Sequence, residues 1–145
     1  MQPSPENIDK LRHCLSNRSE ITAAYLFGSR AEGLARKDSD IDIAVLLSHK
    51  PENVLEYRIT LSGELENRFH KRIDLIVLNA SPLLLQFQVF KKGTLLFERD
   101  PEERALYQMR IMSRYYDYRR YFDYHAEHLK QRIKEVGLGV GSQAS

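Results

Sequence analysis

A glycine-serine turn between two apolar runs is the feature of this sequence that most limits what it can fold into. The first run, residues 21–27, is apolar throughout apart from one threonine and predicts a buried β-strand. Gly28 and Ser29 follow it directly, and Arg30 is placed to open a short helix. Because the first backbone N–H groups of a helix have no partner within the helix, they would face an anion. The turn therefore predicts a phosphate-binding loop.

Two aspartates stand at the start of the second apolar run. Residues 41–47 predict another strand, and Asp40 and Asp42 lie one residue apart at its beginning. Residues two apart on a strand share a face at a spacing of ~6.5 Å. We therefore expect both carboxylates to point the same way.

A third acid lies inside a later strand. In residues 73–78 the alternating pattern sets one apolar face against a second face that contains Asp74. If this strand pairs beside residues 41–47, Asp74 can meet Asp42 across a gap of ~4.8 Å. Three carboxylates in one place repel one another unless a cation lies between them, and Mg²⁺ prefers such oxygen ligands. The acids therefore predict a metal site made by Asp40, Asp42 and Asp74.

The chemistry predicted for this set is nucleotidyl transfer. Two Mg²⁺ ions ~3.5–4 Å apart, with Asp40 and Asp42 holding both and Asp74 holding one, would clamp the attacking and leaving oxygens of a phosphoryl displacement. The Gly28 and Ser29 turn would then bind the phosphates of a nucleoside triphosphate. Asp74, next to the acceptor, is the candidate to help deprotonate an incoming hydroxyl.

The rest of the chain predicts helices around a small sheet. Helical spacing of apolar residues begins near Ser4 and again after Pro51, and a further helix is expected over 82–92, followed by a short strand at 94–98. Residues 101–136 contain neither glycine nor proline, which predicts one long C-terminal helix. We expect an α/β (α+β) fold with a single domain over residues 1–136 and a disordered tail over 137–145.

Composition narrows the function and the compartment. The chain has 145 residues, a length typical of one domain. Its net charge of +2, with 29% charged residues, lacks the basic excess of a protein that binds nucleic acid directly. Its single cysteine, Cys14, cannot form an internal disulfide. With no apolar run of ~18 residues and no signal-peptide pattern, the chain is expected in the cytoplasm and away from membranes.

The motif resembles that of a known family. The run Gly28-Ser29-Arg30-Ala31-Glu32-Gly33 with Ser39-Asp40-Ile41-Asp42-Ile43 is similar to the signature of the polymerase-β-type nucleotidyltransferase superfamily, and Asp74 matches its third acid. The small size resembles the minimal nucleotidyltransferase (MNT) branch. The resemblance implies a mixed sheet flanked by helices, Mg²⁺ and ATP. Glu32 stands where many members have arginine, so Arg30, Arg36 and Lys37 are the basic residues left to contact phosphate.

The resemblance also implies an acceptor. Small members of this branch occur as antitoxins beside HEPN-domain ribonuclease toxins, which they silence by transferring AMP to a toxin tyrosine. A hetero-oligomer with such a toxin is therefore expected. The tyrosines of the long helix, interleaved with arginines, fit an interface, although packing on the chain's own domain is an equal alternative. Transfer to a small molecule such as an aminoglycoside, or neutralisation by binding alone, are the competing hypotheses.

Overall fold

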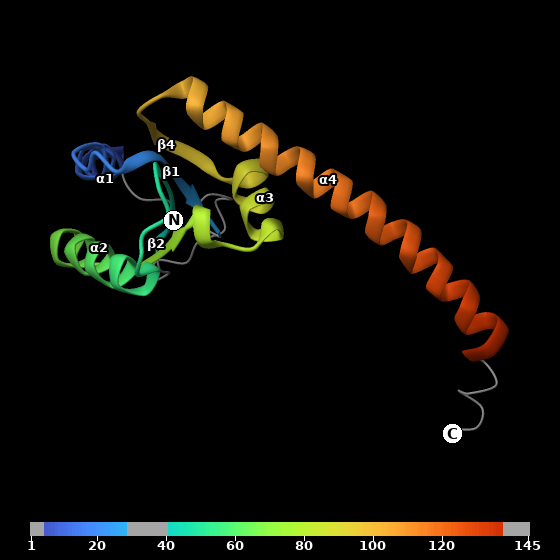
Figure 1. Ribbon diagram of the computed structural model, residues 1–145. Coiled ribbons are helices and arrows are strands. Elements are labelled where there is room, and N and C mark those ends of the chain that lie inside the picture. Colours follow the sequence, from blue (N-terminus) through green and yellow to red (C-terminus); the bar gives the residue numbers. More distant parts are fainter. Residues whose placement is uncertain (1–4, 29–40, 138–145) are drawn as a thin grey trace. The chain divides into compact units, whose positions relative to one another are not determined.

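The computed structural model describes residues 5–28 and 41–137 (Figure 1). The chain divides into two compact units, Met1–Ile111 and Met112–Ser145, and each is described by itself. The elements in chain order are α1 (Pro5–Ser16), β1 (Ile21–Phe27), β2 (Ile41–Leu47), α2 (Val54–Phe69), β3 (Ile73–Val77), the 3₁₀ turn η1 (Leu78–Ala80), α3 (Leu83–Lys92), β4 (Thr94–Glu98), α4 (Pro101–Arg132) and a closing π turn η2 (Ile133–Gly137).

The four strands form one mixed sheet in the order β3-β2-β1-β4. β1 lies between β2 and β4 and is antiparallel to both, whereas β2 and β3 run parallel. The parallel connection passes through α2, as a crossover between parallel strands requires. The predicted mixed sheet flanked by helices is confirmed.

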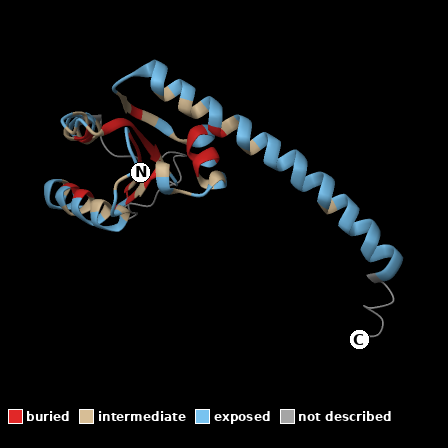
Figure 2. Ribbon diagram, in the orientation of Figure 1, coloured by how far each residue is buried: buried red, intermediate tan, exposed pale blue. Residues whose placement is uncertain are grey.

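The core lies between one face of the sheet and helices α1 and α2. Alternate residues of β2 and β3 enter it, among them Ile43, Val45 and Leu75, where they meet Leu15 of α1 and Leu61 of α2. Figure 2 shows the buried residues concentrated in the sheet and in the helices that cover it. The period-2 pattern of the strands therefore decides which face each acid of the site can occupy.

The opposite face of the sheet carries α3 and the first turns of α4. Tyr25 on β1 meets Phe90 on α3 edge to face at 5.4 Å, and Phe90 meets Tyr107 on α4 at 6.0 Å. The Tyr107 hydroxyl donates a hydrogen bond to Gln86 Oε1 at 2.6 Å, which satisfies a buried amide. This second layer fixes α3 beneath β1, beside the end of the strand that carries Gly28.

The ends of α2 are set by residues that the periodic pattern does not reveal. The helix begins at Val54, three residues after Pro51, because the Asn53 side chain accepts a hydrogen bond from Glu56 N and caps the helix. It ends at His70, which adopts a left-handed conformation with φ 54°. The third strand likewise ends at Val77, one residue before the predicted limit, because Leu78 opens the 3₁₀ turn.

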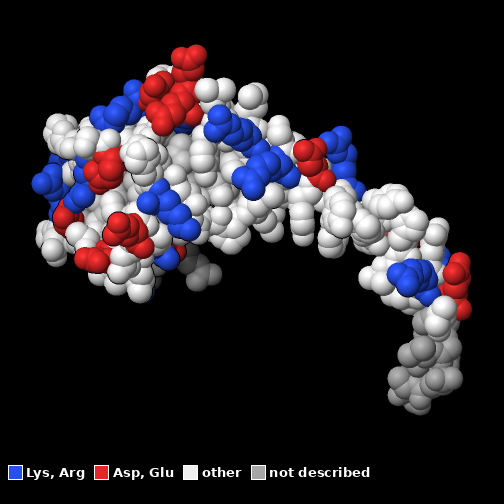
Figure 3. Space-filling view, viewed as in Figure 1, with Lys and Arg blue, Asp and Glu red and all other residues white. Residues whose placement is uncertain are grey.

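The long C-terminal helix forms as predicted and exposes most of its aromatic side chains. Among residues 112–136, the large apolar side chains on the surface are Tyr116, Tyr118, Tyr121, Phe122, Tyr124, Leu129, Ile133 and Val136. On the face of the molecule shown in Figure 3, acidic and basic side chains are interspersed. In the part of the chain that the structure describes, no helix is both long enough and apolar enough to span a membrane.

Candidate active site

Asp42 and Asp74 lie opposite each other on neighbouring parallel strands. The register of β2 and β3 pairs Ile41 with Ile73 and Asp42 with Asp74. Both aspartates alternate with core residues, so their side chains lie on the face of the sheet away from α1 and α2. The predicted pairing of these two strands is confirmed, and neighbouring strands in a sheet generally lie ~4.8 Å apart.

A backbone hydrogen bond just before the two strands fixes the register of this ladder. Ile41 N donates to Arg72 O at 2.9 Å, immediately before the two strands begin to pair. A slip of either strand by one residue would turn its own aspartate into the apolar core. The buried side chains Ile43 and Leu75 on either strand oppose such a slip, so the hydrophobic pattern itself places the two acids together.

Gly28 brings the chain against the Asp42 carboxylate. In the antiparallel ladder Phe27 pairs with Asp42, so Gly28 follows at the same edge of the sheet. Gly28 has φ 76°, and a Cβ at this position would overlap the Asp42 side chain at Oδ2. Only glycine combines this conformation with such a close approach. The turn thus presents backbone, rather than side chain, beside the acid.

The two acids remain accessible to a ligand. Asp74 is exposed and Asp42 is half-buried. Within residues 5–28 and 41–137, no three His, Cys, Asp or Glu side chains gather closely enough to hold a metal ion. Ser29, Arg30 and Asp40 lie outside the described residues, so the structure brings together Gly28, Asp42 and Asp74 of the predicted set.

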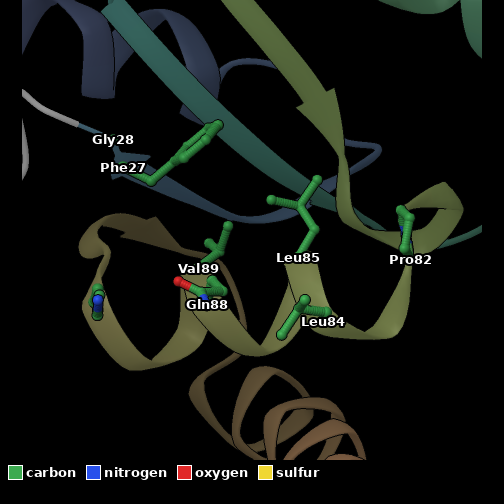
Figure 4. A pocket seen from close by; sticks show the side chains of 8 residues that line it. Phe27, Gly28, Pro82, Leu84, Leu85, Gln88 and Val89 are labelled. Carbon is green, nitrogen blue, oxygen red and sulfur yellow. The ribbon is translucent and has the colours of Figure 1, made fainter. Parts of the chain in front are cut away.

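A hollow of about 450 Å³ adjoins the same turn. Figure 4 shows Phe27 and Gly28 at the end of β1 facing side chains of α3, and the lining residues are Phe27, Gly28, Pro82, Leu84, Leu85, Gln88, Val89 and Lys92. Sequence reasoning assigned residues 82–92 to a helix and missed this hollow. The available signal was the run Leu83-Leu84-Leu85, since three successive apolar residues on a helix cannot all face one core.

Comparison with known proteins decides the family. The family model described as polymerase beta, nucleotidyltransferase, matches residues 9–102. The chain belongs to this family. The match spans both described acids and the Gly28 turn, and it confirms the nucleotidyltransferase fold and enzyme class expected from the motif.

The nucleotidyltransferase has relatives among adenylyltransferases and toxin–antitoxin complexes. It is 29% identical over 99 residues to the protein adenylyltransferase MntA of Shewanella oneidensis, which is 68% of this chain and 69% of the relative. A chain in a crystal structure of a toxin–antitoxin with AMP-PNP matches with a TM-score of 0.64 and 26% identity, over 94% of this chain and 98% of its own length. A chain in the structure of a tri-AMPylated S. oneidensis HEPN toxin in complex with MNT antitoxin matches with a TM-score of 0.61 and 25% identity, over 93% and 96%.

Proposed function

We propose that this nucleotidyltransferase is a protein adenylyltransferase that transfers AMP from ATP to a tyrosine of a cognate HEPN-domain toxin, and so acts as its antitoxin. The observation that carries the proposal is the Asp42–Asp74 pair in register beside Gly28. The relatives support the acceptor class, because one is named a protein adenylyltransferase and another is seen with an AMPylated HEPN toxin. We also propose that the reaction takes place in the cytoplasm.

The donor atoms at this edge of the sheet fit Mg²⁺. Asp42 and Asp74 offer carboxylate oxygens from strands ~4.8 Å apart, and Asp40 precedes Asp42 by two residues in sequence. We propose that Asp40 and Asp42 hold two ions and that Asp74 holds one of them. When bound, Mg²⁺ would neutralise phosphate charge and orient the reacting oxygens.

The other proposed roles are triphosphate binding and proton transfer. Backbone at Gly28, together with Ser29 and Arg30, would hold the triphosphate, since the Gly28 conformation leaves the main chain free to approach an anion. Asp74 would accept the proton of the tyrosine hydroxyl as that oxygen attacks the α-phosphorus of ATP. A bond forms between the tyrosine oxygen and phosphorus, the bond between the α-phosphorus and the bridging oxygen breaks, and pyrophosphate leaves with the electron pair.

The test is transfer of label to the protein partner. The chain is incubated with Mg²⁺, ATP labelled in the α-phosphate and the HEPN-type product of a neighbouring gene. We expect label on a partner tyrosine, its loss in Asp42→Asn or on adding a chelator, and its persistence in Asp9→Asn, which alters an exposed acid of α1. Neutralisation of the partner without any label would overturn the proposal in favour of an antitoxin that acts by binding alone. In a parallel reaction with an aminoglycoside added, label on the aminoglycoside instead of the partner would favour a small-molecule acceptor.

A further inference from the structure

The hollow beside Gly28 has mostly apolar walls. One wall is Phe27 at the end of β1, and the other is α3, which contributes Leu84, Leu85 and Val89 (Figure 4). Leu84 is 54% exposed, a large apolar side chain left open to solvent at the edge of the hollow. A volume of about 450 Å³ lies within the range of small-molecule sites.

Two polar side chains interrupt these apolar walls. Gln88 and Lys92 lie one turn apart on α3, both exposed, and both line the hollow. A glutamine amide carries a hydrogen-bond donor next to an acceptor, which matches the paired donor and acceptor on the edge of a purine base. Lys92 adds a positive charge of the sign that attracts phosphate.

Gly28 is common to the hollow and to the acid site. The register places Asp74, Asp42 and the end of β1 in a row on three neighbouring strands, and the hollow opens between that last strand end and α3. Asp74, on the acceptor side in the proposed function, is therefore separated from the hollow by Asp42 and Gly28. In the proposed function the Gly28 backbone holds phosphate, so a ligand that reaches both Gly28 and the hollow would join a phosphate to a ring that fits apolar walls.

We propose that this hollow binds the purine base of the nucleotide, stacked between Phe27 and Leu84, with Gln88 contacting the edge of the base. This inference rests on the proposed function and assigns its nucleotide-specificity residues. Stacking of a base on an aromatic side chain is a common source of affinity that does not depend on the phosphates. When the base covers Leu84, apolar surface is removed from water, which adds to the affinity.

The experiment compares ATP with inorganic tripolyphosphate, which has the phosphates and no base. Calorimetry on the full chain with Mg²⁺ measures both affinities for the wild type, Gln88→Leu and Leu84→Ser. The matched controls are Gln131→Leu on α4 and Leu55→Ser on α2, where Leu55 is 63% exposed. We expect each hollow variant to weaken ATP binding about tenfold, as loss of a paired contact to a base does, and to leave tripolyphosphate binding within about twofold. The controls should bind both ligands as the wild type does.

Three results would overturn the inference, and they differ in what they imply. Unchanged ATP binding in both variants, with tripolyphosphate still bound, would show that the base does not bind in the hollow. The proposed function would not be affected. Unchanged ATP binding with loss of transfer to the partner would make the hollow an acceptor site. A wild-type chain that binds neither ATP nor tripolyphosphate would overturn the proposed function together with this inference. Thermal melting of the two variants, expected to match the wild type because both positions are exposed, excludes misfolding as the cause.

Discussion

At the scale of single residues, Gly28 is the position where conformation and contact both demand one residue type. Gly28→Ala would place a Cβ against the Asp42 carboxylate in a backbone conformation that alanine rarely adopts. We expect a loss of about 1–3 kcal/mol in the free energy of unfolding, measured by urea denaturation, together with reduced transfer. Gly63→Ala is the matched control, because an added Cβ meets nothing within 4 Å and alanine favours a helix interior, so this change should stabilise the chain by about 0.5–1 kcal/mol. Equal stability of Gly28→Ala and wild type would contradict the described turn.

A change at Asp74 tests whether this acid takes part in the transfer step and not in ATP binding. Its side chain is exposed, so Asp74→Asn should leave the melting temperature unchanged. If Asp74 accepts the acceptor's proton, the variant should still bind ATP while the transfer rate falls about 100-fold or more. Single-turnover transfer and calorimetric ATP affinity, measured side by side, separate the two effects. Transfer at the wild-type rate would remove Asp74 from the reaction.

At the scale of elements, the strands, the end of α3 at Lys92 and the start of α4 at Pro101 could be predicted from the sequence, and the start of α2 could not. The alternation of Ile73, Asp74 and Leu75 was enough to place Asp74 on the face of β3 opposite to the core, because a strand has only two faces. The start of α2 depends on one side-chain bond from Asn53. The hollow depends on where α3 packs beneath β1, a tertiary contact through Tyr25 and Phe90 that no local pattern contains.

A hydrogen bond between α2 and the start of β1 predicts a pH-dependent part of the stability. Tyr57 Oη donates to Glu20 Oε2 at 2.8 Å. Burial alone raises the pKa of Glu20, but backbone hydrogen bonding, the Tyr57 hydroxyl and Arg18 outweigh it and lower that pKa below its ordinary 4.5. A lowered pKa means that the ionised carboxylate stabilises the fold above the ordinary value, and that this contribution disappears as the pH falls through the folded-state pKa.

Tyr57→Phe isolates this contribution. At pH 7 we expect the free energy of unfolding to fall by about 0.5 kcal/mol, the low end for one hydrogen bond because Glu20 is partly exposed. The difference from wild type should shrink as the pH is lowered from 4.5 and Glu20 becomes protonated in both proteins. Urea denaturation at pH 7 and at a pH well below 4.5 measures both values. The same difference at both pH values would exclude the Glu20 carboxylate as the cause.

The exposed aromatic side chains of α4 predict where the proposed HEPN partner would bind. Tyr118 and Phe122 stack at 6.2 Å, and each is 57% exposed. Because exposed aromatic residues are enriched at binding hot spots, the double change Tyr118→Ala and Phe122→Ala should weaken the complex with the HEPN partner at least about tenfold without lowering the melting temperature of the chain. Leu55→Ala with Ile59→Ala, an equally exposed pair on α2, is the control for general loss of apolar surface. Partner binding equal in the two double variants would contradict this assignment.

At the scale of the whole molecule, the described part of the chain contains three of the predicted site residues. Gly28, Asp42 and Asp74 could be predicted because each is tied to a strand whose register is set by buried neighbours. The positions of these three residues are seen in the structure, whereas their roles, like those of Ser29, Arg30 and Asp40, stay predictions from the motif. A single domain over residues 1–136 also stays a prediction, and the division of the chain after Ile111 offers a way to test it.

Removal of residues 112–145 is the decisive change at this scale. In the described chain the last buried residue is Ile111, and every core residue precedes it, so a chain ending there should keep its cooperative unfolding and its affinity for ATP. The same chain should no longer label the HEPN partner, because it lacks the exposed aromatic residues of α4. Circular dichroism melting, calorimetry with ATP and the labelling assay measure these three properties on one sample. Loss of cooperative unfolding would instead support one domain over residues 1–136, and labelling at the wild-type rate would move the partner surface to the strands and helices before Met112.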